Sequence, residues 1–468
     1  MRTIDDQNYR KIIERRDPRY DGRFYWGVTT TRIYCRPICP ARPKPEHICI
    51  FKSATEAEKA GYRPCLRCRP DLAPGSQRWE GTGVSVARAL RLMEEGADAA
   101  VTVETLSATL GMSDRHLRRL FTEHLGASPL DIMVNRRLHL ARQLIVETDR
   151  PLTEIAFASG FQSIRRFNEA FKALYQRPPS DFRRRSPPTS SPGLQLRLSV
   201  RKPYDWAHML AFLKRHQTYG VERVDDTSYT RFIPRPERAP GHLCVTFSDQ
   251  ALLVAFDNIN LLELRPLIAR LRHLFDVDHN PSDLPHNSSL QPNGIRIPGC
   301  FDAFEVAVGI ILGQLVSTTH ARQLMQRLVT TYGHRLTDDE VFAFPSPELL
   351  KNTEIEAIGL TRQKAEAVRG LSRLIHEKSV VLSRMADLSA TRQMLMSIPG
   401  VGPWTVDLIA MRCLGDADAF PRKDLVIQRA LAAGGHEEDL WMSLRSYLTQ
   451  ILWRDYARSM LAKKGGKP

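Results

Sequence analysis

Four of the eight cysteines form two closely spaced pairs, and this pattern constrains the fold more than any other feature of the chain. Three residues separate Cys35 from Cys39, two separate Cys65 from Cys68, and 25 residues lie between the pairs. Two short loops of this kind let four thiolates converge on one Zn²⁺ in a tetrahedron. Disulfides are the alternative, but the N-terminus has no apolar segment typical of a secretory signal, so the sequence favours zinc. Cys49 fits neither pair and is expected to be a small buried residue.

Length and charge narrow the class of protein. The chain has 468 residues, 42% of them hydrophobic, which is enough for about three domains. No stretch approaches the ~20 apolar residues that span a bilayer, so we expect a cytoplasmic protein without membrane contact. The net charge is +15, and 33 of the 67 Lys and Arg but only 22 of the 52 Asp and Glu precede residue 186. Such a basic surface attracts DNA or RNA, although a basic enzyme has the same composition.

Two segments rich in turn-forming residues divide the chain. They cover residues 72–83 and 183–193, and the second has no apolar face to bury. Beyond the second linker, residues 243–247 and 252–256 are typical of strands, whereas helical periodicity dominates from about Asp302 onward. We therefore expect a small α+β region followed by an all-α region in the C-terminal part.

The middle part contains an internal repeat. Residues 106–121 are echoed by residues 155–171, with Gly111 and Gly160 lying 49 positions apart. Each copy has an apolar helix, a glycine turn, a serine N-cap and an amphipathic helix, which is the helix-turn-helix pattern. A generic helical bundle with a solvated basic face is the alternative, but it would not repeat the glycine and the cap. We predict DNA-binding helices near Ser113–His124 and Ser163–Leu174.

The residues around the cysteines, GVTTTRIYCRPICPAR at 27–42 and AGYRPCLRC at 60–68, closely resemble the N-terminal metal-binding domain of the Ada adaptive-response proteins. The resemblance implies that Cys35 irreversibly accepts a methyl group from a DNA methylphosphotriester, with Cys39, Cys65 and Cys68 as the other zinc ligands. Zinc keeps the sulfurs as nucleophilic thiolates. Methylation would remove one negative charge from the metal site, so the site would repel the DNA backbone less. Nearby arginines would then bind the phosphates against less repulsion. These arginines are Arg32, Arg36, Arg42, Arg63, Arg67 and Arg69.

The repeat resembles the DNA-binding domain of the AraC family, including residues 151–156 and the pair Gly160-Phe161. Several side chains are expected to face outward at helical spacing and to reach bases or phosphates. They are Arg115, His116 and Arg119 in the first helix, and Ile164, Arg165 and Asn168 in the second.

Near the C-terminus, residues 398–406 (IPGVGPWTV) are typical of the hairpin of a helix-hairpin-helix motif. Gly400 and Gly402 let the backbone approach a phosphate, and the following helix offers free N–H groups and its positive dipole end. A tight corner between two helices would give the same pattern. Asp424, twenty residues past Trp404, is either an N-cap or a catalytic carboxylate, and both roles can hold at once.

Several segments of the C-terminal part resemble the AlkA-type 3-methyladenine DNA glycosylases II, namely residues 202–206, 298–305, 311–317 and 445–447, together with Trp453. The likeness covers nearly everything after about residue 194. It implies that the damaged nucleotide is flipped out of the duplex and that Leu315 is the wedge that fills the gap, with Gln314 beside it at the DNA. It also implies Asp424 as the catalytic aspartate, and Trp404 and Trp453 as the aromatic pocket for the base. A carboxylate stabilises positive charge on the sugar, indole faces favour a cationic alkylated base, and an apolar wedge offsets the cost of flipping.

Three absences and one departure from the family refine the function that the resemblance implies. Trp404 stands where bifunctional members of the superfamily carry a Schiff-base lysine, so we expect a monofunctional enzyme. Cys413 is the last cysteine, which argues against a C-terminal iron-sulfur cluster. Leu408 replaces a pocket tyrosine of the family, so the substrate range is expected to differ. No cysteine has the Pro-Cys-His-Arg neighbours needed for guanine repair.

The combined prediction is a multidomain alkylation-damage protein. Its partners would be double-stranded DNA, at alkylated lesions and at promoter sites, and RNA polymerase if it is an activator, and we expect a monomer. The rival hypothesis is a transcription factor whose glycosylase half only binds DNA. The predicted fold is a small zinc-bound α+β domain (1–75), an all-α double helix-turn-helix domain (84–185), an α+β domain (194–297) and an all-α helix-hairpin-helix glycosylase domain (298–462).

Overall fold

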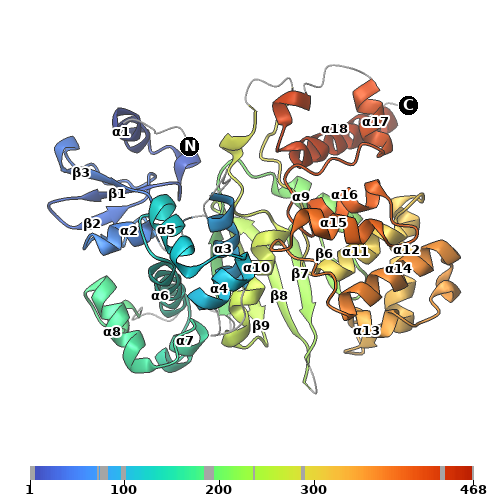
Figure 1. The fold of residues 1–468 in the computed structure, drawn as a ribbon, viewed down its shortest axis with the longest axis horizontal. Helices are drawn as coiled ribbons and strands as arrows, with labels where there is room; N and C mark the ends of the chain where they lie inside the picture. Colours follow the sequence, from blue (N-terminus) through green and yellow to red (C-terminus); the bar gives the residue numbers. More distant parts are fainter. Residues whose placement is uncertain are drawn as a thin grey trace. The chain divides into compact units, whose positions relative to one another are not determined.

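The computed structural model describes residues 6–70, 73, 83–95, 102–183, 194–235, 238–285, 290–432 and 438–465. It separates into two compact units (Figure 1). The first comprises Met1–Lys202, Ser248–Ala269 and Val277–Asn280, and the second comprises Pro203–Phe247, Arg270–Asp276 and Pro281–Pro468. Both predicted linkers lie almost entirely outside the described residues.

The first unit begins with a small four-stranded sheet of order β3-β1-β2-β4. Strand β1 is antiparallel to β2 and β3, whereas β2 and β4 run parallel. The fully buried Trp26 and Tyr34 anchor it, and it brings the ends of β2 and β4 together. The elements are α1 (Asp6–Arg15), η1 (Pro18–Tyr20), β1 (Tyr25–Val28), β2 (Ile33–Cys35), η2 (Pro45–His47), β3 (Ile48–Phe51), α2 (Ala54–Lys59) and β4 (Arg63–Pro64).

A helical part follows in the same unit, and the predicted repeat is confirmed. Ser113 and Ser163 cap α5 and α8 by accepting hydrogen bonds from the N–H groups of His116 and Arg166. Gly111 and Gly160 take left-handed φ values of 67° and 91°, which explains the repeated glycine. The elements are α3 (Gly83–Glu95), α4 (Val103–Leu110), α5 (Asp114–Leu125), α6 (Pro129–Glu147), α7 (Leu152–Ala158), α8 (Ile164–Tyr175) and η4 (Pro179–Phe182).

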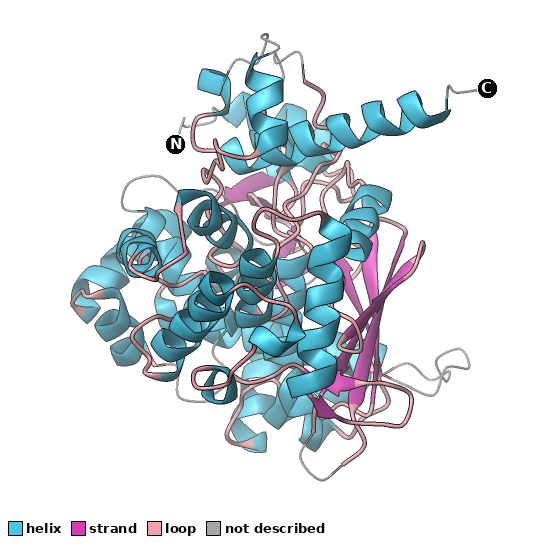
Figure 2. Cartoon of the chain, turned by 90° about the vertical axis from the view of Figure 1, so that its right-hand side faces the viewer, coloured by secondary structure: helices cyan, strands magenta, loops and turns pink. Residues whose placement is uncertain are grey.

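The longer strands of the C-terminal part pair in antiparallel fashion (Figure 2). In the first unit, β5 (Leu194–Ser199) pairs with β9 (Ala251–Asp257), followed by η5 (Leu261–Glu263). Helix α10 (Leu264–Leu274) begins in this unit, and its residues from Arg270 onward belong to the second unit. In the second unit, β7 (Ser228–Ile233) lies between β6 (Glu222–Val224) and β8 (Gly241–Ser248), preceded by α9 (Trp206–Arg215). The strands predicted at 243–247 and 252–256 are confirmed as parts of β8 and β9.

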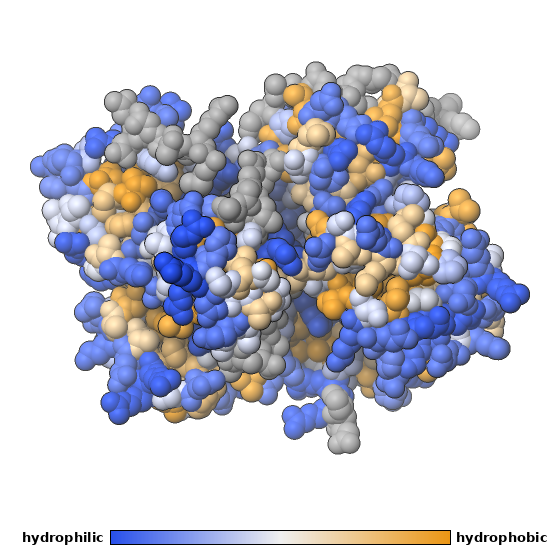
Figure 3. Space-filling view, viewed as in Figure 1, coloured by the Kyte–Doolittle hydropathy of each residue, from blue (hydrophilic) through white to orange (hydrophobic). Residues whose placement is uncertain are grey.

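The rest of the second unit is a helical bundle around one large apolar core. Helix α11 is its centre, because Ala307, Val308 and Ile311 are fully buried where it packs on α14 and α16. The surface over α12, α13 and α14 is mostly hydrophilic (Figure 3), as expected for helices that turn one apolar face inward. The helices are α11 (Ala303–Leu312), α12 (Thr318–Tyr332), α13 (Pro347–Leu350), α14 (Arg362–His376), α15 (Leu388–Met396), α16 (Pro403–Arg412), α17 (Leu425–Ala432) and α18 (Arg445–Gly465).

The structure corrects two details of the sequence prediction. A two-residue ladder, β10 (His334–Arg335) with β11 (Phe342–Ala343), interrupts the region predicted to be all-α. Cys49 is half-buried rather than buried, with its Sγ atom 3.4 Å from the carbonyl oxygen of Gly27 and 3.3 Å from the hydroxyl of Tyr62. No helix in the described part of the chain is long and apolar enough to cross a membrane.

Candidate functional site

The four paired cysteines converge in the first unit. Their Sγ atoms all lie within 4.8 Å of one another. Four sulfurs at zinc-thiolate bond lengths are separated by about 3.8 Å in a tetrahedron, which is compatible with this limit. Cys35 ends β2 and Cys65 directly follows β4, and the backbone N–H of Arg36 points to Cys68 Sγ at 3.4 Å. The donor set therefore fits zinc, which keeps all four sulfurs as thiolates.

The arginines near this zinc site differ in their exposure. Arg36 is buried and forms an ion pair with Asp21, with its Nε atom 2.7 Å from Oδ1, so the expectation that it meets DNA is wrong. It is held in place because it also bonds the carbonyl oxygen of Cys68. Arg69 pairs with Glu147 on α6 at 3.3 Å. Three other arginines are exposed, namely Arg32, Arg42 and Arg67, and Arg63 is half-buried.

Cys35 itself is nearly enclosed in this structure. Only 2% of its surface is exposed, compared with 8% for Cys65, while Cys68 is half-buried. Its part in methyl transfer stays a prediction.

The two recognition helices carry their predicted side chains on the solvent side. Arg115, Arg119, Ile164, Arg165 and Asn168 are all exposed, and His116 is half-buried. Their opposite faces bury apolar side chains such as Leu117 and Phe167. Arg165 also pairs with Glu169 one turn later at 2.9 Å. Which of these residues contact DNA stays a prediction.

The helix-hairpin-helix is formed by α15, the turn at 397–402 and α16. Gly400 has a φ of +84°, and a Cβ atom there would lie 3.1 Å from Gln363 Cγ. Gly402 is the N-cap of α16 with no side-chain cap, and a Cβ atom there would meet open space. The first N–H groups of α16 are thus left uncovered, which suits an anion such as a phosphate.

Asp424 combines both roles that the sequence left open. Its Oδ1 atom accepts the N–H of Val426 at 3.0 Å, so it caps the start of α17. The same oxygen accepts the indole N–H of Trp453 at 3.1 Å, and Oδ2 accepts that of Trp404 at 3.4 Å. The half-buried carboxylate is therefore held between two indole rings from α18 and α16.

One residue of this aromatic group was missed by the sequence analysis. Phe212 on α9 stacks on Trp453, with ring centroids 6.3 Å apart and an interplanar angle of 19°. Only its place on the apolar face of a helix could have indicated it, and that pattern is common to every amphipathic helix. Leu408, the departure from the family, is buried on α16.

The turn between α11 and α12 presents Leu315 to solvent. Its side chain is fully exposed, at 104% of the reference area, and its φ of +54° is unusual for a residue with a branched side chain. The helical periodicity expected from Asp302 onward is interrupted here, because Leu315 lies between the end of α11 and the start of α12. Gln314 secures the turn, because its Nε2 atom donates to the carbonyl oxygen of Gly400 at 3.0 Å and to Thr405 Oγ1 at 2.8 Å.

Three features define a multidomain DNA-binding and repair protein. They are the thiolate metal centre, the double helix-turn-helix, and the helix-hairpin-helix with a carboxylate held by two indoles. Family models match the metal-binding domain of Ada at residues 8–71, a helix-turn-helix domain at 106–185 and the AlkA N-terminal domain at 195–302.

Curated relatives match the same regions. The chain is 35% identical over 479 residues to the "Probable bifunctional transcriptional activator/DNA repair enzyme AlkA" of Mycobacterium tuberculosis, covering 95% of each chain. It is 31% identical over 273 residues to DNA-3-methyladenine glycosylase 2 of Escherichia coli, covering 55% of this chain and 95% of that protein. It is 34% identical over 171 residues to the E. coli enzyme Ada, covering 36% and 47%. The chain belongs to the family of bifunctional Ada/AlkA-type transcriptional activator and DNA repair proteins.

Proposed function

We propose that the second unit removes alkylated bases of the 3-methyladenine and 7-methylguanine type from DNA by monofunctional N-glycosidic hydrolysis. The observation that carries the proposal is the carboxylate of Asp424 bonded by the indoles of Trp404 and Trp453. The two N–H donors hold the anion in a fixed orientation, so no reorganisation is needed when positive charge develops on the sugar. The indole faces themselves favour a cationic alkylated base over a normal one.

The DNA is held and opened by the elements beside this carboxylate. Leu315, exposed on a left-handed turn, fills the space that the flipped nucleotide leaves in the stack. Gly400 and Gly402 bring the N-terminus of α16 to a backbone phosphate. Gln314 fastens the wedge turn to the hairpin, and its amide oxygen is the atom we assign to the DNA. Since no lysine stands at 404, the product is an intact abasic site.

Replacing Asp424 by Asn tests the enzyme against the rival hypothesis of a DNA-binding platform. The amide keeps the size and one oxygen for the cap but removes the negative charge, so release of 3-methyladenine from methylated DNA should fall roughly 10²–10³-fold. Release is measured on duplexes with single lesions, with Lys423→Gln, an exposed neighbour, as the matched control. Unchanged release in the Asp424 variant would contradict the enzymatic function.

We further propose that the first unit senses damage. The Cys35 thiolate takes the methyl group of a methylphosphotriester, forming a thioether and leaving an ordinary phosphodiester, with Cys39, Cys65 and Cys68 keeping the zinc. The helix-turn-helix pair then binds promoter DNA through Arg115, Arg119, Arg165 and Asn168. Family membership supports transcriptional activation, and we assign RNA polymerase as a partner of a monomeric, cytoplasmic protein that associates with the nucleoid. We keep the four-domain division at 1–75, 84–185, 194–297 and 298–462.

A further inference from the structure

Two arginines of the first unit meet at the turn of the second helix-turn-helix copy. Arg137 lies on α6, and Arg265 lies at the start of α10. A Cβ atom on Gly160, in the turn after α7, would lie 3.3 Å from Arg137 Nε and 3.0 Å from Arg265 Nη1. Because both guanidinium groups pack against this one glycine, they lie close to each other. All three residues belong to the first unit.

The two positive charges repel each other in a partly dry environment. Both side chains are half-buried, so water screens their charges less than on an open surface. Desolvation lowers the pKa of Arg137. Desolvation, followed by repulsion from Arg137 and Arg136, lowers the pKa of Arg265. Like charges this close destabilise each other unless an anion compensates them.

No carboxylate in the described part of the chain forms an ion pair with either arginine. Arg137 makes no hydrogen bond to any described residue. Arg265 donates from Nη2 to the carbonyl oxygen of Met93 at 2.9 Å, and its Nη1 has no described partner. Glu94, at the end of α3, is paired with Arg136 at 2.9 Å. The guanidinium donors that meet at the glycine are therefore available to a ligand.

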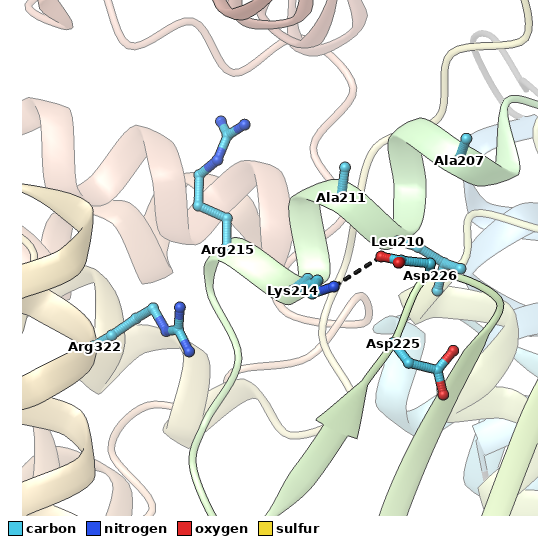
Figure 4. Close-up of a pocket in the computed structure, with 8 residues that line it drawn as sticks. All are labelled: Ala207, Leu210, Ala211, Lys214, Arg215, Asp225, Asp226 and Arg322. Carbon is cyan, nitrogen blue, oxygen red and sulfur yellow. Dashed lines mark hydrogen bonds and ion pairs between the residues drawn. The ribbon is translucent and has the colours of Figure 1, made fainter.

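This convergence distinguishes the pair from arginines that only line the same cavity. The second unit has a pocket of about 430 Å³ beside α9 (Figure 4). Arg215 and Arg322 point in different directions there, and Lys214 is paired with Asp226 at 2.7 Å. Those cations share no common point, whereas Arg137 and Arg265 do.

We propose that Arg137 and Arg265 together bind one phosphate group. Guanidinium forks match the geometry of phosphate oxygens, and one phosphate accepts hydrogen bonds from both forks at once. Its negative charge compensates the repulsion between the two cations. The source is a free phosphoanion or the backbone of DNA, because the turn at Gly160 leads into α8, the second predicted recognition helix.

Chemical modification of arginine tests this site on the full chain. Phenylglyoxal reacts with accessible guanidinium groups, and peptide fragmentation assigns each adduct to one residue. Inorganic phosphate, titrated against chloride at constant ionic strength, should slow the modification of Arg137 and Arg265 about tenfold once it exceeds its dissociation constant about tenfold. Arg10, an exposed arginine on α1, is the internal control, and its rate should not change.

A second arm of the experiment replaces inorganic phosphate by undamaged duplex DNA at low salt. Protection by inorganic phosphate alone identifies a free phosphoanion as the ligand, and protection by the duplex alone identifies a backbone phosphate. Protection by both means that the site takes phosphate from either source. If neither slows the modification of Arg137 and Arg265 more than that of Arg10, the proposal is overturned.

The variant Arg137→Gln shows whether the two arginines share one phosphate. It removes no hydrogen bond or ion pair from the described part of the fold, so the variant is expected to fold. With one guanidinium group left, the ligand that protects Arg265 in the wild type should lose most of its effect. The matched control Arg10→Gln removes the same charge elsewhere and should keep the protection of Arg265. Undiminished protection of Arg265 in Arg137→Gln would contradict a shared site.

Discussion

Asp276 is a half-buried residue in the second unit with a left-handed φ of 48°. Its Oδ2 atom accepts the hydroxyl of Tyr447 at 2.9 Å and the N–H of Ile297 at 3.2 Å. Burial raises the pKa of Asp276 to about 6, against the opposing effect of Arg296, those two hydrogen bonds and Arg384. The folded protein therefore binds this proton more tightly than the unfolded chain does.

Replacing Asp276 by Asn should change how stability depends on pH. A carboxyl group with a raised folded-state pKa contributes stability that is fully present below its unfolded pKa and is lost as pH rises through about 6. The wild type should thus lose ~3 kcal/mol from this group between about pH 4 and pH 7, and the Asn variant should not. Urea unfolding followed by tryptophan fluorescence across this range measures the difference. Parallel pH profiles for the two proteins would show that Asp276 titrates normally.

At the scale of elements, one buried arginine ties the sheet of the second unit to its helical bundle. Arg231 on β7 forms two hydrogen bonds, at 3.1 and 2.7 Å, with the carboxylate of Glu305 on α11. Glu222 on β6 lies 3.7 Å from the same guanidinium and accepts the hydroxyl of Tyr229 at 2.8 Å. Helix α11 ends at the turn that carries Leu315, so this contact fixes the base of the wedge.

Replacing only one partner of this buried pair should lower the free energy of unfolding more than replacing both partners. Arg231→Met leaves the carboxylates of Glu305 and Glu222 without their cationic partner and should lower the free energy of unfolding by about 3–5 kcal/mol. The double variant Arg231→Met/Glu305→Leu removes the Glu305 charge as well, leaving only Glu222 without a partner, and should be less destabilised than the single one. Chemical denaturation of the three proteins provides the comparison. If the double variant loses more stability than Arg231→Met alone, the pair itself contributes net stability and the argument from desolvation is wrong.

Elements with local signals could be predicted from the sequence, whereas their long-range contacts could not. The helix-turn-helix repeat was found because glycine turns and serine caps act within a few residues. The convergence of Asp424 with two tryptophans was anticipated only through the family resemblance. Phe212 and the buried state of Arg36 were not anticipated, because tertiary packing decides them. An arginine beside a zinc ligand has the same sequence signal whether it faces DNA or pairs with Asp21.

At the scale of the whole molecule, the zinc part and the helix-turn-helix part form one connected unit. Tyr34, next to Cys35, donates its hydroxyl to Glu58 Oε1 at 2.6 Å. The same carboxylate contacts Asn135 and lies 3.3 Å from His139 Nε2, both on α6 between the two helix-turn-helix copies. These part-buried contacts join the sheet that carries Cys35 to α6. The carboxylate of Asp424, by contrast, belongs to the second unit.

This division predicts that methylation of Cys35 changes DNA binding without changing base release. Exposure to methylphosphotriester DNA should add about 14 Da, one CH₂, to a peptide containing Cys35. Losing one negative charge at the metal site should strengthen binding of undamaged duplex about fivefold, since one charge near a phosphate is worth ~1 kcal/mol in water. The rate of 3-methyladenine release per bound duplex should stay the same because Asp424 lies in the other unit.

Intact-mass and peptide-mass spectrometry, a binding titration and a single-turnover release assay on one preparation measure all three quantities. Cys49→Ser is the matched control, because Cys49 lies outside the metal cluster, and it should behave as the wild type does. A wild type without added mass contradicts the sensor. Added mass with unchanged affinity shows that the lost charge does not reach the DNA. A matching change in single-turnover release would mean that the two units do not act independently.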